Sequence, residues 1–351
     1  MRAAIFERFN QPLTVREVPD PACPPDGALV KVAACGVCRS DHHAWSGNDP
    51  DVVLPHVPGH ELAGIVIETG PLCRGFRTGD RVTAPFILGC GTCPDCRGGH
   101  PTICDHQHVV GFSAWGAFAE YLPVPRADFN LVRLPETLSF ELAAAMGCRV
   151  TTAFQALAYR ARLRAGEWIA IHGSGGVGIS AIAIACAMGA RVIAVDIRAE
   201  ALDLARAAGA HEVIDATAVG DPGDAVRDLT GGGVHVSVDA LGITDTFRNS
   251  IRSLRKFGRH VQVGMPVGPH VTVPLPLLEL VYSRQIAICG SRGMPAAHFP
   301  PLLAMVEAGS LDLSSLIRRR IVLEEAGTAL AALDRYSGAG ITVIDRFTVA
   351  T

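Results

Sequence analysis

The sequence predicts an α/β protein with two domains, one rich in β-strands and one built around a doubly wound parallel sheet. Its 351 residues exceed the length of one average domain, and 49% of them are hydrophobic, enough for large buried cores. Up to about residue 150, short β-like runs alternate with glycine and proline, and no helical period persists. Beyond that point apolar strands alternate with helices, which indicates βαβ units and a parallel sheet.

The β-rich part is predicted from the runs "RAAIF", "ALVKVAACG" and "LAGIVIETG", with "GDRV" as a turn that enters a strand. The C-terminal part returns to mixed elements. There "HFPPLLAMVEAG" and "LEEAGTALAALDRYSG" have the pattern of helices, and "ITVIDRFTV" that of a terminal strand. We therefore expect the C-terminal part to be structured.

The parallel sheet is predicted from residue 168 onward. "WIAIHG" and "RVIAVD" are buried strands, and each precedes a helix, "GISAIAIACAMGA" (178–190) and "AEALDLARAAGA" (199–210). Further apolar strands follow in "EVIDA", "HVSVDALG", "RHVQVG" and "QIAICGS". Such short, nearly continuous apolar strands fit a sheet that helices cover on both faces.

Composition excludes several classes of protein. The net charge of −3, with both signs spread along the chain, gives no support to nucleic-acid binding. The N-terminus has no apolar core of a signal peptide, so we expect a cytoplasmic protein. Residues 168–190 lack charged side chains, but the glycine-rich turn inside them argues against a membrane span. With 11 cysteines, an odd number, and no secretory signal, disulfides are not expected.

A dinucleotide-binding motif is predicted at "GSGGVG", which fits G-x-G-x-x-G, follows a predicted strand and opens a predicted helix. Gly173 allows the tight turn, Gly175 lets the backbone approach a pyrophosphate, and Gly178 lets the helix pack close to the strand. The helix N-terminus offers N–H groups to the phosphates. The cofactor-binding residues of this Rossmann motif are Gly173, Gly175, Gly176, Val177 and Gly178.

The choice of cofactor is predicted from Asp196, which ends the next strand 18 residues after Gly178. A carboxylate there can accept a hydrogen bond from the ribose 2′-hydroxyl and would repel a 2′-phosphate, which favours NAD over NADP. Arg198 nearby keeps NADP open. The alternative is a glycine-rich loop that merely packs, with Asp196 as a local cap.

Four cysteines lie close together in "CGTCPDCRGGHPTIC", at Cys90, Cys93, Cys96 and Cys104. Disulfides, an iron–sulfur cluster and a metal ion compete to explain them. The first three cysteines fit the spacing of bacterial ferredoxins, but the fourth lies too far along and precedes Asp105 rather than proline. Four thiolates from one loop can close a tetrahedral site around Zn²⁺, which favours structural zinc.

Other metal donors are scattered through "CGVCRSDHHAWSG", "VPGHELAG" and "MGCRVTTAF". Each cysteine or histidine there is more often a buried thiol or a satisfied histidine than a ligand. Composition and spacing do not select three of them.

The order of motifs resembles the zinc-dependent alcohol dehydrogenases of the medium-chain dehydrogenase/reductase family. The similarity runs in family order between about residues 25 and 265. The similar segments are "CGVCRSDHHAWSG", "LPHVPGHELAG", "GDRV", the four-cysteine loop, "GAFAEY", "GCRVTTAFQAL", "GSGGVG", "VDALG" and "VGMP".

The resemblance implies two domains and two zinc ions per chain. A GroES-like catalytic domain would take residues 1–149 and 292–351, with the structural zinc lobe at about 89–105, and the Rossmann domain would take 150–291. The catalytic zinc would be held by Cys38, His60 and Cys148, leaving one position open for water or substrate. Glu61 would be a neighbouring or transient ligand, and Asp41 would fix the tautomer of His60.

The resemblance also implies the chemistry, the reversible NAD-linked oxidation of a primary or secondary alcohol to an aldehyde or ketone. Zinc would stabilise the alkoxide by its charge. The proton would leave through Ser40 and the nicotinamide ribose to His43. A histidine suits this role because the unperturbed pKa of its side chain lies near neutrality. Hydride would pass to the nicotinamide. His42 is expected to be a surface histidine.

Further site residues follow from the same resemblance. The nicotinamide would contact Thr152 and the segment "VGMP", which contains Val263 and Gly264. The channel for the alcohol would be lined by Trp45, Phe86 and Trp115. The alternative is that these aromatic side chains are simply core.

Two positions depart from the family pattern. Arg149 stands where many relatives have glycine, and could meet a phosphate or a polar group of the substrate. Ile341 stands where many relatives carry a phosphate-binding arginine, and Arg39 could supply that charge instead.

Two rival functions remain. One is a polyol or other alcohol dehydrogenase of the same family, although Cys148 stands where polyol enzymes typically have a carboxylate. The other is a non-catalytic nucleotide-binding or redox-sensing protein. By analogy with the family we expect a homo-oligomer, a tetramer rather than a dimer, and a small-molecule alcohol or aldehyde as the partner.

Overall fold

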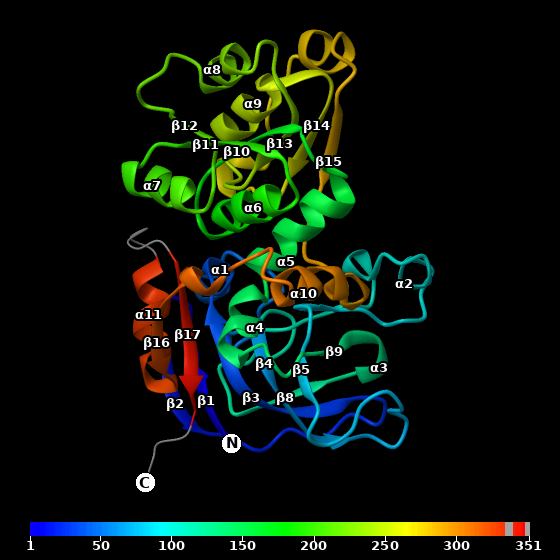
Figure 1. The fold of residues 1–351 in the computed structure, drawn as a ribbon. Coiled ribbons are helices and arrows are strands. Elements are labelled where there is room, and N and C mark those ends of the chain that lie inside the picture. The colour runs from blue at the N-terminus through cyan, green and yellow to red at the C-terminus, as the bar shows by residue number, and fades with distance from the viewer. Residues whose placement is uncertain (334–339, 348–351) are drawn as a thin grey trace. The chain divides into compact units, whose positions relative to one another are not determined.

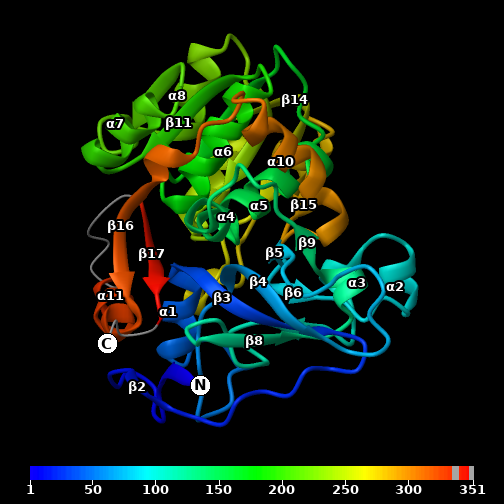
Figure 2. The ribbon, with the colours of Figure 1, turned by 60° about the horizontal axis from the view of Figure 1, so that its bottom comes forward.

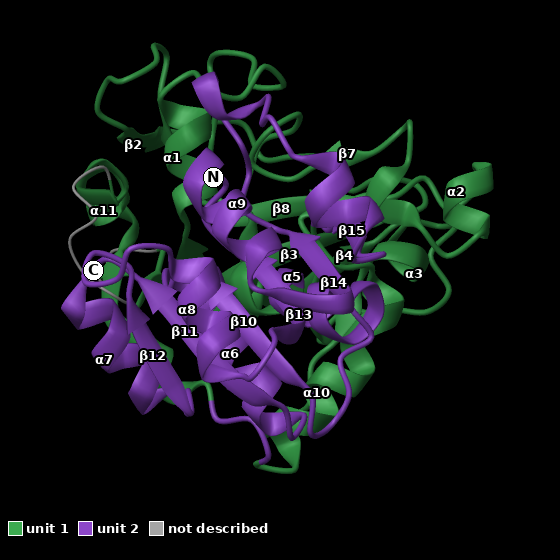
Figure 3. Ribbon diagram, turned by 90° about the horizontal axis from the view of Figure 1, so that it is seen from above, with its two compact units in different colours: residues 1–151, 293–309, 313–351 green, residues 152–292, 310–312 purple. Residues whose placement is uncertain are grey.

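The computed structural model describes residues 1–333 and 340–347. The chain forms two compact units, which Figure 3 shows in different colours. Unit 1 comprises residues 1–151, 293–309 and 313–351, and unit 2 comprises residues 152–292 and 310–312. The last residues of the predicted helix at "LEEAGTALAALDRYSG" and of the predicted strand at "ITVIDRFTV" lie outside the described residues.

Unit 1 is built around a sheet in the order β16-β17-β3-β4-β5-β9, with β8 paired to β3. Its neighbouring strands are antiparallel except for β16 and β17. The C-terminal β17 lies between β16 and β3, as Figure 2 shows, so distant parts of the chain share one sheet. Its strands are β3 (Ala28–Val37), β4 (Glu61–Thr69), β5 (Arg81–Thr83), β8 (Tyr121–Val124), β9 (Val132–Arg133), β16 (Ile317–Val322) and β17 (Ile341–Arg346).

Two small antiparallel pairs complete the strands of unit 1, within the part of the chain that is described. They are β1 (Arg2–Ile5) with β2 (Thr14–Glu17), and β6 (Ile87–Leu88) with β7 (His108–Val109). The core of the unit is lined by small and branched side chains of the central strands, among them Val30, Leu62 and Val66.

Short helices connect the strands of unit 1 and carry side chains into its interior. Its helices are α1 (Arg39–Trp45), α2 (Pro94–Arg97), α3 (Ala127–Asn130), α4 (Phe140–Met146), α10 (Phe299–Glu307) and α11 (Ala326–Ala332), with the shorter turns η1 (Pro101–Ile103), η5 (Ala296–His298), η6 (Ser314–Leu316) and η7 (Leu323–Glu325). Helix α5 (Arg149–Phe154) begins in unit 1 and ends in unit 2. The sequence pattern missed α1, α4 and α5 because none is long enough to repeat a helical period twice.

Unit 2 contains a six-stranded parallel sheet in the order β12-β11-β10-β13-β14-β15, labelled in Figure 1. Helix α6 packs on β10 and β11, and α7 packs on β11 and β12. Helices α8 and α9 pack on each other, α8 also on β12 and β14, and α9 also on β10, β13 and β14. The chain therefore winds in both directions from β10, and the predicted α/β class is confirmed.

The bounds of unit 2 follow the apolar runs of the sequence. Its elements are β10 (Trp168–His172), α6 (Gly176–Ala187), β11 (Arg191–Asp196), α7 (Ala199–Ala207), β12 (Glu212–Asp215), α8 (Pro222–Leu229), β13 (Val234–Asp239), α9 (Thr244–Arg252), β14 (Leu254–Gln262) and β15 (Ala287–Gly290), with the π-helices η2 (Gln155–Arg160) and η4 (Leu277–Tyr282) and the 3-10 helix η3 (Gly268–His270). The helix predicted over 178–190 begins two residues earlier and ends three residues earlier.

Residues 168–190 do not span a membrane, because a strand, a turn and a helix divide them. Among the described helices, none combines the length and the apolar character that a membrane crossing requires.

Candidate active site

Three segments of unit 1 bring four donor side chains together. Cys38 follows the end of β3, His60 directly precedes Glu61 at the start of β4, and Cys148 follows α4. The donor atoms of these four residues all lie within 4.8 Å of one another, and all four side chains are buried. We call this cluster the open site. It depends on the fold, because α4 packs on both β3 and β4.

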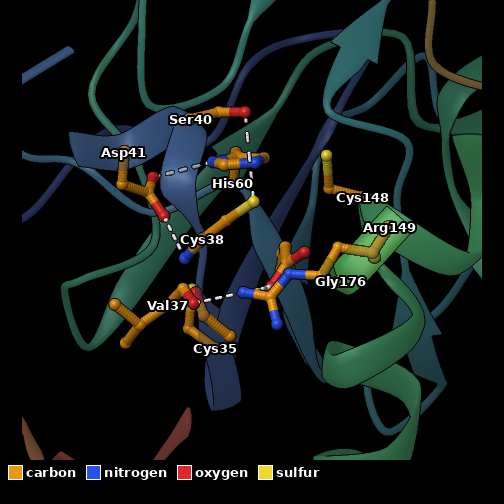
Figure 4. Close-up of polar contacts among 12 residues, drawn as sticks. Cys35, Val37, Cys38, Ser40, Asp41, His60, Cys148, Arg149 and Gly176 are labelled. Carbon is orange, nitrogen blue, oxygen red and sulfur yellow. Dashed lines mark hydrogen bonds and ion pairs between the residues drawn. The ribbon is translucent and has the colours of Figure 1, made fainter. Parts of the chain in front are cut away.

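Asp41 holds the histidine of the open site. Its Oδ1 accepts hydrogen bonds from His60 Nδ1 at 2.7 Å and from the Gly59 amide at 3.0 Å. Its Oδ2 accepts from the Cys38 amide at 2.9 Å, which also caps α1. Asp41 is fully buried. One carboxylate thus orients the imidazole and fixes the backbone of the neighbouring cysteine (Figure 4).

The donors fit a metal ion. Because the Nδ1–H of His60 donates to Asp41, Nε2 is the nitrogen left to offer a lone pair to a metal ion, and it has no hydrogen-bond partner within residues 1–333 and 340–347. The hydrogen bond from Cys148 and the charges of Arg149 and His60 lower the pKa of Cys38 well below its ordinary value, against the effect of burial. A thiolate, a second thiol and a free imidazole nitrogen are zinc donors, and the Glu61 carboxylate is a further donor beside them.

The side chain of Arg149 lies in the interior of unit 1, where its partners are other residues of the chain. Its side chain is buried, and its NH2 group lies 3.5 Å from Glu61 Oε2 and donates a hydrogen bond to the Val37 carbonyl. In Figure 4 the guanidinium lies beside Val37. The charged groups Glu61 and Cys38 raise the pKa of Arg149 further, against burial, so it stays a cation. The predicted contact with a phosphate or with substrate is replaced by a buried ion pair.

Two glycines make the room in which Glu61 sits. A Cβ atom at Gly36, which faces Glu61 across β3 and β4, would lie 2.1 Å from Glu61 Oε2. A Cβ atom at Gly147 would lie 2.6 Å from the Glu61 Cα. Burial raises the pKa of Glu61 to about 8 in the metal-free chain, although the Arg149 charge acts in the opposite direction. A larger side chain at Gly36 would clash with the carboxylate itself, and one at Gly147 would clash with the backbone of Glu61.

Aromatic side chains surround the open site. The rings of Phe86 and Phe112 lie 5.5 Å and 5.2 Å from the ring of His60. Phe86 and Phe112 share an apolar cluster with Cys38 and Cys148, and Trp45 packs against it. Trp115 is 39% exposed, and its Nε1 donates to the Pro55 carbonyl at 3.0 Å. Phe86 and Trp45 thus border the site, whereas Trp115 is outside that cluster.

The residues of the predicted proton path lie on α1. Ser40 Oγ is 3.9 Å from Cys38 Sγ. His43 Nδ1 is buried and has no hydrogen-bond partner among the residues that the structure describes. Burial, and then the charges of Arg39 and His42, lower the pKa of His43 below its ordinary value. No direct hydrogen bond joins Ser40 to His43 within the described residues.

Two other residues of α1, His42 and Arg39, have neighbours that the sequence did not indicate. His42, which we expected on the surface, is buried and packs its ring 5.4 Å from the ring of Trp45. The reason is that α1 turns this side toward the unit interior. Arg39 donates a hydrogen bond to the Leu333 carbonyl, at the end of α11.

The four cysteines of the loop, which we call the four-cysteine lobe, also form one cluster. The sulfurs of Cys90 and Cys96 are 3.9 Å apart, and those of Cys93 and Cys104 are 3.7 Å apart. All eleven cysteines of the chain are free. Sulfurs at about 2.3 Å from one tetrahedral metal ion would be roughly 3.8 Å apart, so the spacing fits one zinc ion and excludes disulfides.

Local hydrogen bonds prepare the lobe for a cation. The Thr92 hydroxyl and the amides of Thr92 and Cys93 donate to Cys90 Sγ, which lowers the pKa of that thiol to about 5. The Asn130 side chain bonds both the amide and the carbonyl of Gly89, where the lobe begins. The lobe is therefore held from within and at its base.

In unit 2 the glycine-rich loop lies between β10 and α6. Gly173 adopts a φ of +94°, which disfavours any other residue. A Cβ atom at Gly178 would lie 1.9 Å from the Gly173 carbonyl oxygen, whereas at Gly175 it would meet nothing within 4 Å. Gly176 and Val177 begin α6, whose first amides carry no side-chain cap. The loop thus presents open backbone at a helix N-terminus.

Asp196 lies at the end of β11 and reaches that loop. Its Oδ2 accepts from the Ser174 amide at 2.7 Å, and its Oδ1 accepts from the Ile197 and Arg198 amides at 2.9 and 3.0 Å. The Arg198 Nε lies 3.5 Å from Asp196 Oδ1. Asp196 therefore positions the loop as well as offering a carboxylate beside it.

The remaining predicted cofactor residues also belong to unit 2. The Thr152 hydroxyl is buried and has no hydrogen-bond partner in the described part of the chain. The amides of Val263 and Gly264, just after β14, donate to the Asp239 carbonyl. A Cβ atom at Gly264 would lie 2.2 Å from the Gly242 amide, so the two loops touch.

Sequence reasoning missed Phe112 and the partners of Arg149. Phe112 lies in "VVGFSAW", a stretch without cysteine, histidine or a carboxylate, so no metal-binding motif indicated it. Arg149 was visible only as an unusual residue beside Cys148. The contact with Glu61, 88 residues earlier, exists only once β4 and α4 are packed.

Comparisons with known proteins agree with this arrangement. Residues 24–136 match the family model described as an alcohol dehydrogenase GroES-like domain, and residues 176–308 match that of a zinc-binding dehydrogenase. The chain is 38% identical over 293 residues to an alcohol dehydrogenase of Geobacillus stearothermophilus, covering 83% of this chain and 84% of that one.

Two further similarities span nearly the whole chain. An NAD-dependent alcohol dehydrogenase of Sulfurisphaera tokodaii is 32% identical over 354 residues, covering 98% of this chain and 99% of the relative. The solved structure of the alcohol dehydrogenase TADH from Thermus sp. ATN1 superposes with a TM-score of 0.91 at 32% identity, covering 99% of this chain and 100% of that one.

Proposed function

The chain belongs to the zinc-dependent alcohol dehydrogenases of the medium-chain dehydrogenase/reductase family, and on that premise we propose that it catalyses the NAD-linked, reversible oxidation of a primary or secondary alcohol. The observation that carries the proposal is the open site, where Cys38, His60 and Cys148 converge and one imidazole nitrogen has no hydrogen-bond partner among the described residues. The product is an aldehyde or a ketone.

We assign one zinc ion to the open site and one to the four-cysteine lobe, two per chain. In the open site Cys38, His60 and Cys148 would hold the ion, which supplies the positive charge that makes an alcohol hydroxyl easier to deprotonate. Asp41 keeps His60 in the tautomer that offers Nε2 as a donor. In the lobe all four positions would be thiolates, which leaves no place for substrate.

The residues of α1 handle the proton. Ser40, beside Cys38, would accept a hydrogen bond from the alcohol hydroxyl and pass its proton toward His43. Because burial lowers the pKa of His43, this imidazole is neutral at pH 7 and can take up a proton. Phe86, Phe112 and Trp45 exclude water from the open site and favour an apolar alcohol.

Unit 2 would bind NAD, which accepts the hydride. The open backbone around Gly175 and the uncapped N-terminus of α6 suit a pyrophosphate. The Asp196 carboxylate suits ribose hydroxyls and disfavours a 2′-phosphate. The relative from Sulfurisphaera tokodaii, described as NAD-dependent, supports this choice.

The test is an assay of NAD⁺ and NADP⁺ reduction with short aliphatic, benzylic and terpenoid alcohols. We expect NADH formation with at least one alcohol and little or no NADPH. Replacing Ser40 by alanine should lower kcat by about 100-fold, the scale of a positioned proton-transfer group, without loss of zinc. Full activity of the Ser40→Ala variant would contradict the proton path, and a preference for NADP⁺ would contradict the role of Asp196.

A further inference from the structure

Arg149 connects the three segments that carry the donors of the open site. It follows Cys148 in the chain, it bonds the carbonyl of Val37, which precedes Cys38, and it pairs with Glu61, which follows His60. Figure 4 shows its guanidinium on the side of the cluster away from Ser40. The charge of Arg149 therefore lies next to the proposed metal ligands and can influence them directly.

Glu61 is a competing donor for the open site. Its carboxylate oxygen lies within the 4.8 Å cluster together with Cys38, His60 and Cys148, and carboxylates are common zinc ligands. Within the described residues neither carboxylate oxygen has a hydrogen-bond partner. The carboxylate occupies space that is free because Gly36 has no side chain. The NH2 group of Arg149 lies 3.5 Å from Glu61 Oε2 and supplies an opposite charge.

Two cations therefore compete for one buried carboxylate. A buried carboxylate that loses its counter-charge is strongly destabilised, and it is relieved either by taking up a proton or by binding another cation. In the absence of Arg149 that cation is the metal ion of the open site. Coordination by Glu61 would close the fourth position, which the proposed reaction needs for the alcohol.

We propose that Arg149 is a positioning residue that holds the Glu61 carboxylate away from the metal ion and so keeps the fourth position of the open site free. The proposal rests on the proposed function, in which Cys38, His60 and Cys148 hold zinc. The alternative role is a purely structural tie, in which Arg149 braces the three segments without regard to Glu61.

A double-mutant cycle on zinc release separates the two roles. We would load wild type, Glu61→Gln, Arg149→Gln and the double variant with zinc, and then measure the rate of release to excess chelator. The phase that belongs to the open site is the one missing in Cys38→Ala. Arg149→Lys, which keeps the charge, is the matched control, and Arg149→Gly repeats the cycle in case the Arg149→Gln variant does not fold.

The deciding quantity is the slowing of zinc release that Glu61 causes, the rate measured for the Glu61→Gln variant divided by the rate with the native glutamate. We expect this ratio to be about tenfold larger without Arg149 than with it, the scale of effects from residues just outside a metal site. Arg149→Lys should give the wild-type ratio. A visible-absorption shift of the cobalt-substituted Arg149→Gln protein, absent in the double variant, would report the added carboxylate.

Equal ratios in both backgrounds would overturn the proposal, and so would faster release in Arg149→Gln regardless of residue 61, since a structural tie predicts that. Wild-type chains with a filled lobe and no second zinc would instead overturn the proposed function. The metal count made before the chelator is added distinguishes these failures.

Discussion

The four-cysteine lobe and the open site are two cysteine-rich sites of the same unit, assembled in opposite ways. The lobe takes its four thiols from 15 consecutive residues, and local amide and hydroxyl groups bond to its sulfurs. The open site takes its donors from three segments that β3, β4 and α4 bring together, and it adds an imidazole and a carboxylate. In the proposed function the four thiols of the lobe would fill all positions around a zinc ion, whereas the three proposed ligands of the open site would leave one position for substrate.

The largest expected difference between the two sites is in activity. Cys38→Ala should lower kcat by about 1,000-fold or more. The reason is that the metal charge, which would stabilise the deprotonated alcohol by several kcal/mol, is lost with the site. Cys93→Ala should retain measurable turnover but lower the Tm and speed proteolysis within residues 89–105. Steady-state kinetics and thermal unfolding of the two variants check this. Equal loss of turnover in both would break the distinction between a chemical and a structural site.

Buried histidines occur in both units, but their hydrogen-bond partners differ. His60 is bonded to a carboxylate, whereas in unit 2 His172 and His260 are bonded to the hydroxyls of Ser253 and Ser250. Burial, and for His172 also the charge of His260, lowers the pKa of these two to about 3 and about 4. Burial alone thus keeps a histidine neutral and does not make it a ligand.

The sign of the pH effect follows from those values. In the unfolded chain both histidines titrate near pH 6.5, so below that pH the unfolded state binds more protons than the folded state. Lowering the pH from 7.5 to 5 should therefore reduce the free energy of unfolding by roughly 2 kcal/mol for each of the two histidines. Denaturant titrations at the two pH values measure it.

His172→Gln removes one of these groups and should make the pH-dependent loss about 2 kcal/mol smaller than in wild type. His211→Gln, at an exposed position of the same unit where the imidazole Nδ1 accepts a hydrogen bond from the Val192 amide, is the comparison for replacing a histidine outside the core. The same pH dependence in all three proteins would show that His172 does not titrate as its burial implies.

The last prediction, similar in size to the pH effect, concerns the space around Glu61. Gly36→Ala places a methyl group only 2.1 Å from Glu61 Oε2, and should cost about 1–3 kcal/mol of stability and weaken zinc binding in the open site. Gly98→Ala in the lobe meets its nearest atom, the Pro94 carbonyl oxygen, at 3.2 Å and should have a much smaller effect. Chemical denaturation and zinc counts compare the two, and equal costs would mean that Glu61 adapts freely.

What the sequence predicted well is what is local. The strands "RVIAVD" and "WIAIHG", the glycine-rich loop and the four-cysteine lobe are each visible in a few consecutive residues, because apolar runs and donor spacing are local patterns. The donors of the open site became selectable only through the family resemblance, since single cysteines and histidines carry no spacing signal of their own.

The rest could not be predicted because it depends on packing between distant segments. Arg149 was recognised as unusual, but its partners Val37 and Glu61 lie far away in the sequence and meet it only in the folded unit. His42 is expected on the surface because no role falls to it, and it is buried because of the way α1 packs, which the sequence pattern does not show. The tetramer and the cytoplasmic location stay predictions from the family resemblance and the sequence.

The central claim is that one unit holds two zinc sites of different kinds, and elemental mass spectrometry of the purified chain tests it most directly. The account predicts near two zinc ions per wild-type chain and near one in both Cys38→Ala and Cys93→Ala, with turnover lost only in the first. One zinc ion in the wild type, unchanged in Cys38→Ala, would contradict it, and so would iron in place of zinc.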